Sequence, residues 1–413
     1  VYEGEIEQLS SAETQGAGIR VVVDGRQGFA YAGTLDEGVL KESLEEARDN
    51  AVFGSPDPHY GLAEPDGVAA ADLDLFRPEL ADFATDRKVE LAMELERATL
   101  GADARISGME SSDYVDSIAE GAVATNTGIR ASDRQSICYL AAYSMATEAE
   151  ETQTGFGFSV GRAPDDLDVA VAAGDAADRA TRLLGAKKPR SQRLTVILDP
   201  WVTAQFLSVL SSTLNGEAVL KGRSLFADRL GDDVASPLLS LVDDPTDPRA
   251  MNAGAFDDEG LATRRNTLID TGRLKQFVQN TYTGRRSGTA STGSAVRSGF
   301  KSTPGVGCRA LALTPGTKSQ ADLIAEIDNG LLVQSVSGLH SGVNPVSGDF
   351  STGAEGLHIS GGSLGAPQRE FTIASTIQRM LKDVTAVGSD LTWLPMSAAG
   401  VSLVIGDVTM SGA

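Results

Sequence analysis

The chain has 413 residues, enough for two or three domains of ordinary size with a large buried core. Its formal net charge of −22 argues against direct nucleic-acid binding, because lysine and arginine that neutralise phosphates supply most of that affinity. No apolar run reaches the roughly 18 residues of a membrane span, and two distant cysteines are neither a disulfide framework nor a zinc knuckle. We expect a cytoplasmic protein with no nucleic-acid or membrane partner.

The first hundred residues predict a strand pair and two helices. The β-branched stretch Gly18–Asp24 predicts a strand, and a return strand begins near Phe29. Apolar residues at helical spacing predict amphipathic helices over Leu35–Phe53 and Arg87–Leu100, with a Pro- and Gly-rich loop at Gly54–Gly67 between them. Val1 is not a methionine and lies in a strand-like stretch, so we expect that a short N-terminal piece is absent.

The next segment predicts a β-meander followed by a helix and a linker. Asp113–Thr152 alternates like antiparallel strands around a turn at Asn126–Gly128, and Gly155–Arg162 is typical of a strand with small residues. Asp166–Gly185 predicts a helix that ends at glycine. The charged stretch Lys187–Arg193 predicts a linker, so we place a domain boundary at 190.

The second half has a different texture. Leu194–Pro200 predicts a buried strand that leads into a helix capped by Asp199, with Pro200 in its first turn. A hairpin is expected at Asn266–Val278, a helix at Gln320–Asn329 before the strand Leu331–Val336, and a short helix near 374–381, with short strands and turns through the last seventy residues. The fold class is therefore α+β: an N-terminal domain, 1–190, with a curved antiparallel sheet and helices, and a β-rich, barrel-like domain, 191–413.

Residues that could carry hydrolytic chemistry are few. A catalytic zinc ion needs about three protein ligands, yet the chain has three histidines, His59, His340 and His358, none with a partner at helical spacing and the last two in separate β segments. Cys138 lies in an apolar run typical of a core, whereas Cys308 follows a turn where it could be exposed. No Gly-x-Ser-x-Gly elbow or phosphate loop is present. We therefore assign no catalytic and no metal-binding residue.

Two further stretches invite a functional interpretation. LNGEAVLKGRSLF, 214–226, places Glu217 four residues before Lys221, the spacing of a weak ion pair on a helix. SGVNPVSGDFSTGAEG, 341–356, has four glycines and an Asn-Pro pair, which predict a system of tight turns. Its only acids are Asp349 and Glu355, and amides freed in such turns could pair with an extended peptide.

Five stretches in order resemble the TldD/PmbA family and together span nearly the whole chain: GIRVVVDGRQGFA, LTVILDP, GEAVLKGRSLFADRLGDDVASPLLSLVDDP, FDDEGLATRRNTLIDTGRLKQFVQNTYTGRRSG and GVNPVSGDFSTGAEG. The resemblance implies one of two kinds of subunit. TldD-type chains carry His-Glu-x-x-x-His and a cysteine near the C-terminus, which resemble a zinc peptidase site, whereas TldE (PmbA) chains lack these ligands and pair with TldD. The heterodimer degrades or trims unfolded and leader peptides; an older name for the family is modulator of DNA gyrase.

This chain resembles the TldE type, because Gly216 and Lys221 stand where the histidines would be and no cysteine follows Ser389. The resemblance implies a non-catalytic subunit without a cofactor of its own, whose TldD-type partner holds the zinc, although a homodimer is also possible. It implies that the chain completes a substrate chamber and holds an extended peptide, for which we name four substrate-binding candidates: Glu217, Lys221, Asn344 and Asp349.

Two alternatives stay open at this stage. The first is a self-sufficient metallopeptidase with an atypical metal site built from carboxylates, for which the acidic stretch Asp243–Pro248 offers material. The second is a non-enzymatic peptide-binding or regulatory protein, including a modulator of gyrase. We interpret the excess of acidic residues as a hydrated surface that keeps the protein in solution. The functional alternative is an acidic cleft that attracts basic peptides.

Overall fold

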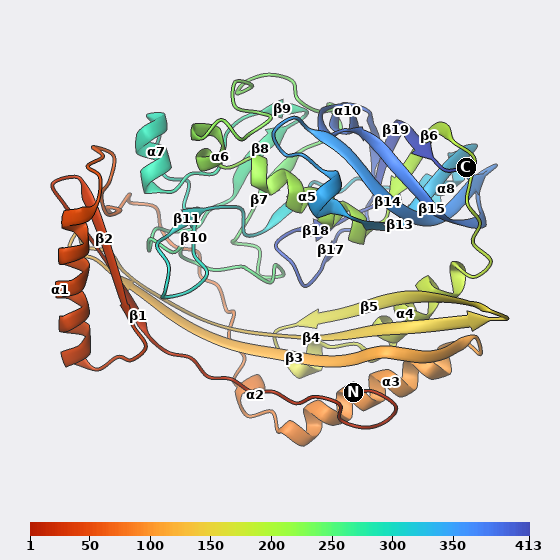
Figure 1. Cartoon of the computed structure of the whole chain (residues 1–413), viewed down its shortest axis with the longest axis horizontal. Coiled ribbons are helices and arrows are strands. Elements are labelled where there is room, and N and C mark those ends of the chain that lie inside the picture. The colour runs from red at the N-terminus through yellow and green to blue at the C-terminus, as the bar shows by residue number, and fades with distance from the viewer.

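The computed structural model describes all residues from 1 to 413, and its N-terminal part combines a strand pair, a three-stranded sheet and three longer helices (Figure 1). Its elements are β1 (Ala17–Val23), β2 (Arg26–Ala32), α1 (Glu37–Phe53), α2 (Pro78–Ala81), α3 (Thr85–Ala102), β3 (Ile106–Ala124), β4 (Arg130–Glu148), β5 (Glu151–Gly161), a 3-10 turn (Pro164–Asp166) and α4 (Val169–Arg182).

The C-terminal part is richer in strands, and its helices are short except for the first. Its elements are β6 (Gln192–Leu198), α5 (Pro200–Thr213), α6 (Gly216–Leu220), β7 (Leu241–Asp243), β8 (Asn266–Asp270), β9 (Arg273–Leu274), α7 (Thr281–Ser287), β10 (Ala295–Val296), β11 (Gly305–Val306), β12 (Leu311–Leu313), α8 (Gln320–Ala325), β13 (Asn329–Ser337), α9 (Leu339–Gly342), β14 (Asp349–Ser360), β15 (Ser363–Thr376), α10 (Ile377–Lys382), β16 (Val384–Val387), β17 (Thr392–Trp393), β18 (Ala399–Gly400) and β19 (Leu403–Ser411).

The N-terminal sheet is a long antiparallel meander with β4 in the middle. α3 and α4 pack against one face, where Ser112 and Ser144 donate hydrogen bonds to the backbone carbonyls of Ala92 in α3 and Ala176 in α4. The glycines of β5 permit this close packing, because a Cβ at Gly157 would lie 2.1 Å from the Ala172 oxygen. Figure 1 shows the sheet curving below the C-terminal strands, with α3 on its far side.

The C-terminal part contains a closed barrel. Its strands follow the order β15–β14–β13–β6–β19, and a further pairing of β15 with β19 closes the ring, while β16 adds to β19. β6 runs parallel to β13, whereas the other barrel pairs are antiparallel. Side chains from these strands and from α5 form the main core, which has 38 buried residues. The predicted α+β class with a barrel-like second half is confirmed.

The long segment between α1 and α2 ties the two parts together. Asp57 accepts a hydrogen bond from the Tyr282 hydroxyl at 2.9 Å, and the Leu62 carbonyl accepts one from Arg285. A further bridge joins Arg179 of α4 to Asp199, the residue that caps α5, at 2.8 Å. The domain division at residue 190 stays a prediction. No helix combines the length and the apolar composition that crossing a membrane would require.

Four expectations about elements were wrong. Residues 1–16 form no strand beyond one bridge between Tyr2 and Glu5. The helix expected at Gln320–Asn329 ends at Ala325 because the following residues turn into β13. The last seventy residues contain long strands, since β14, β15 and β19 build the barrel. His340 lies in the helical turn α9, not in a β segment.

Candidate functional site

The short helix α6 carries Gly216 and Lys221, the two positions where the resemblance to TldD-type chains implies histidines. The Asn215 side chain caps it by accepting a hydrogen bond from the Ala218 amide at 2.8 Å, which is why the helix starts at Gly216. Glu217 and Lys221 form the predicted ion pair, with 2.5 Å between Oε1 and Nζ. Both side chains are about half exposed, so this pair contributes little to stability.

Gly216 has no room for a side chain. A Cβ at this position would lie 1.8 Å from Oε1 of Gln279, a buried oxygen that has no hydrogen-bond partner. The Gln279 backbone is held firmly, because its amide donates to the Thr292 hydroxyl at 2.7 Å and its carbonyl accepts from the Thr292 amide at 3.1 Å. The amide end of the Gln279 side chain therefore lies in the space beside Gly216 and would have to move to admit a side chain there.

These residues do not fit a zinc ion. Gly216 offers no ligand atom, and the Lys221 ammonium would repel a divalent cation and already neutralises Glu217. No group of three or more His, Cys, Asp or Glu side chains in the chain is arranged to hold a metal. The chemistry of α6 is thus limited to hydrogen bonding and weak charge contacts.

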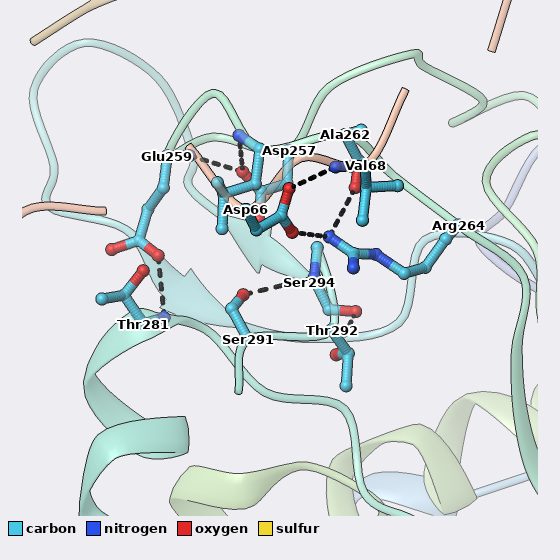
Figure 2. Close-up of polar contacts among 12 residues, drawn as sticks. Asp66, Val68, Asp257, Glu259, Ala262, Arg264, Thr281, Ser291, Thr292 and Ser294 are labelled. Carbon is cyan, nitrogen blue, oxygen red and sulfur yellow. Dashed lines mark hydrogen bonds and ion pairs between the residues drawn. The ribbon is translucent and has the colours of Figure 1, made fainter. Parts of the chain in front are cut away.

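A buried acidic network lies in the loop before β8, near Thr281 and Ser294 (Figure 2). Asp257 accepts hydrogen bonds from the amides of Glu259, Leu261 and Ala295 at 2.9 to 3.1 Å. Burial, with the nearby Glu259 charge, raises the pKa of Asp257 to about 7. These three contacts hold the loop before β8 in place. The Asp257 carboxylate therefore orders the backbone and is not available to bind a ligand.

Glu259 joins this network to the N-terminal strand pair. Its side chain accepts a hydrogen bond from the Thr281 amide at the start of α7, at 2.8 Å, and from Arg20 of β1 at 3.1 Å. Figure 2 also shows Arg264 bound to Asp66, with 2.6 Å between the charged atoms. Hydrogen bonding to Arg264 and to the Val68 amide outweighs burial, which acts the other way, and lowers the pKa of Asp66.

Asn344 and Asp349 lie together at the entrance to β14. The Asn344 side chain accepts from the amides of Val346 and Ser347, and its own amide donates to the Asp349 carbonyl at 2.9 Å. The turn thus satisfies these amides internally, and from Asp349 onward the stretch is strand. No hydrogen bond or ion pair joins this turn to Glu217. The substrate-binding role of the four candidates stays a prediction.

The other side chains that could carry chemistry are buried or hydrogen-bonded within the protein. Cys138 is fully buried, and burial raises its thiol pKa to about 12. Cys308 packs against the main core instead of being exposed, and burial raises its pKa well above the ordinary value. His358 bonds to Asn329 at 2.9 Å. Buried Asp243 accepts from two backbone amides through Oδ1, while its Oδ2 has no partner.

The sequence interpretation missed Gln279 and the Asp257–Glu259 network. The stretch that contains Asp257 and Glu259 was noticed only for its resemblance to a family. Gln279 and Gly216 meet through an isolated bridge between Asn215 and Val278, a contact that no local pattern signals. The one local hint for Asp257 was that it and Glu259 lie two residues apart in a stretch with apolar neighbours.

Comparison with known proteins agrees with this fold. The PmbA/TldA metallopeptidase models match residues 1–52 for domain 1, 78–184 for the central domain and 191–412 for the C-terminal domain. The architecture is that of a family built from an open sheet and a closed barrel. The chain belongs to the PmbA/TldD metallopeptidase family.

Individual relatives are similar over most of their length. Metalloprotease PmbA of Escherichia coli O157:H7 is 28% identical over 391 residues, which cover 94% of this chain and 84% of that protein. The PmbA homolog of Haemophilus influenzae is also 28% identical, with the same coverage. The crystal structure of TldE from Thermococcus kodakarensis superimposes with a TM-score of 0.91 at 26% identity, covering 100% of this chain and 93% of that one.

Proposed function

We propose that this chain is the non-catalytic subunit of a two-chain zinc peptidase that degrades or trims unfolded peptides and leader peptides. The observation that carries the proposal is that α6 offers no set of side chains able to bind zinc. Gln279 occupies the space beside Gly216, and Lys221 pairs with Glu217 where related chains place a histidine. The likeness to the TldE structure supports the same assignment.

In this proposal the metal and the activated water belong to a partner subunit of the TldD type. This chain completes the substrate chamber and holds an extended peptide, with Glu217, Lys221, Asn344 and Asp349 as candidate contacts. Glu217 takes no part in water activation, because Lys221 pairs with it and α6 offers no second ligand for a metal ion. A heterodimer is the expected assembly, and the cytoplasmic location stays a prediction.

The experiment is reconstitution with an unfolded peptide substrate. The chain alone should leave the peptide intact, and adding a TldD-type partner should give cleavage that a chelator abolishes. A partner whose motif glutamate is replaced by glutamine is the matched control and should remain inactive with this chain present. If the partner alone cleaves as fast as the mixture, the proposed subunit role is wrong.

A further inference from the structure

The strand pair β1–β2 and the helix α1 form a small unit at one end of the molecule (Figure 1). The two strands pair with each other and with no other strand. We call residues 17–54 the strap. Its buried side chains are small, and none of them belongs to a hydrophobic cluster of the sheet or the barrel: Ala30, Ala32, Ser43, Ala47 and Ala51.

Few polar contacts join the strap to the rest of the chain. Its hydrogen bonds and ion pairs to other segments are two, one from the Asp57 amide to the Gly25 carbonyl at 2.8 Å and one from Arg20. Tyr31 also meets Phe300 edge to face, with 6.3 Å between ring centroids. A lone strand pair is marginally stable in water, and segments with few buried apolar contacts open most easily. The strap should therefore open before the barrel does.

Arg20 makes the one ion pair between the strap and the rest of the chain, and its partner is buried. The guanidinium lies 3.1 Å from Glu259, whose side chain is 1% exposed and pairs with no other base. Asp257 brings a second acid next to Glu259 by accepting a hydrogen bond from its amide at 2.9 Å. Removing one partner of a buried pair is costly, because the other charge stays behind unpaired. Arg20 therefore fastens the strap.

Glu259 also connects the strap to the candidate site. Its second carboxylate oxygen accepts a hydrogen bond from the Thr281 amide at the start of α7, at 2.8 Å (Figure 2). Two residues earlier in the chain, the amide end of the Gln279 side chain lies beside Gly216 of α6. A change at Glu259 can thus reach the segment that packs against α6.

We propose that the strap opens and recloses as a unit while the barrel stays folded, and that Glu259 transmits its position to the start of α7 and to α6. In the closed form the Glu259 carboxylate is held between Arg20 and the Thr281 amide. When the strap opens, this carboxylate loses its cation and turns toward solvent, which weakens its contact with Thr281. The inference does not depend on the proposed function, because it concerns a motion of this chain alone.

The test is hydrogen–deuterium exchange of the whole chain, measured by mass spectrometry on peptides from the strap, α7, β6 and β13. In the wild type, the amides that pair β1 with β2 should exchange faster than those of β6 and β13, which line the main core. Arg20→Met keeps an apolar stem and removes the charge. It should speed exchange in the strap and in α7 by about tenfold or more and leave β6 and β13 unchanged.

Two further variants separate this ion pair from a general loss of stability. Glu259→Gln keeps an acceptor for the Thr281 amide and removes the ion pair, so the strap should exchange faster while α7 keeps the wild-type rate. Lys41→Met is the matched control, because Lys41 pairs with Glu37 on the surface of α1, where the two side chains are 72% and 84% exposed. This variant should exchange like the wild type throughout.

The proposal is overturned if the wild-type strap exchanges as slowly as β6 and β13, or if Arg20→Met leaves the strap or α7 at the wild-type rate. Faster exchange of β6 and β13 together with the strap would also overturn it, since the whole chain would then unfold at once. If Arg20→Met does not fold, Glu259→Gln decides, because an unchanged strap in that variant contradicts the role of the ion pair.

Discussion

The barrel and the three-stranded sheet use their edges and faces in opposite ways. The barrel closes through β15 and β19 and encloses the largest core of the chain. The sheet keeps β3 and β5 as edges and covers one face with α3 and α4. A closed barrel has few unpaired backbone groups to offer a ligand, whereas an open sheet offers many. The comparison teaches that recognition and structural support can reside in different parts of this chain.

The largest predicted effect separates a barrel residue from a sheet residue. Phe206 is 2% exposed and packs edge to face on Phe350, so Phe206→Ala should lower the free energy of unfolding by about 3–5 kcal/mol. Tyr139→Ser in β4 should cost less, about 1 kcal/mol, because that side chain is only partly buried. Urea unfolding measures both. Equal losses would mean that this side of the three-stranded sheet is packed as tightly as the barrel core.

A second prediction concerns pH and the buried carboxyl of Asp243. Burial raises its pKa from 3.8 to about 6. The folded state therefore holds a proton that the unfolded state has lost, so stability should fall as pH rises from about 4 to about 6, by roughly 3 kcal/mol, and level off above. Asp243→Asn keeps an acceptor for the amides of Arg309 and Ala310.

The matched measurement is urea unfolding of wild type and Asp243→Asn across that pH range. The variant should lack this fall, with other groups contributing equally to both curves. Two parallel curves would show that Asp243 titrates normally. Asp243 is the last residue of β7, which pairs with β12 and β8. The result therefore also tests how well water is excluded from this small sheet.

A third, smaller effect tests the packing beside α6. Gly216→Ala should destabilise the chain by about 1 kcal/mol or less, because the amide end of the Gln279 side chain must move aside while alanine favours the helix. Adding Gln279→Ala should recover much of that loss, so the double variant should be more stable than the sum of the single changes implies. Simple additivity would show that Gln279 does not fill the space at position 216.

Local patterns were sufficient to predict much of the fold. Asp199 and Pro200 predicted the start of α5, and the β-branched run Gly18–Asp24 predicted β1. The small residues of Gly155–Arg162 were interpreted as a strand that another element approaches closely, and α4 packs there. Each of these features depends on residues that are neighbours in sequence, which is why pattern reasoning reached them.

The remaining features depend on distant contacts. Barrel closure needs the pairing of β15 with β19, and no residue pattern specifies that register. Asn344 and Asp349 were expected to sit among free amides, but their turn satisfies those amides itself. The Glu217–Lys221 pair was predicted from spacing alone, whereas Gln279 reaches Gly216 only through the tertiary fold.

The most direct test of the central claim is zinc binding by the purified chain alone. Equilibrium dialysis followed by elemental analysis should find no stoichiometric zinc, and Glu217→Ala should give the same result as the wild type. A TldD-type partner handled in parallel should retain about one zinc per chain. One tightly held zinc in this chain, lost on Glu217→Ala, would contradict the account.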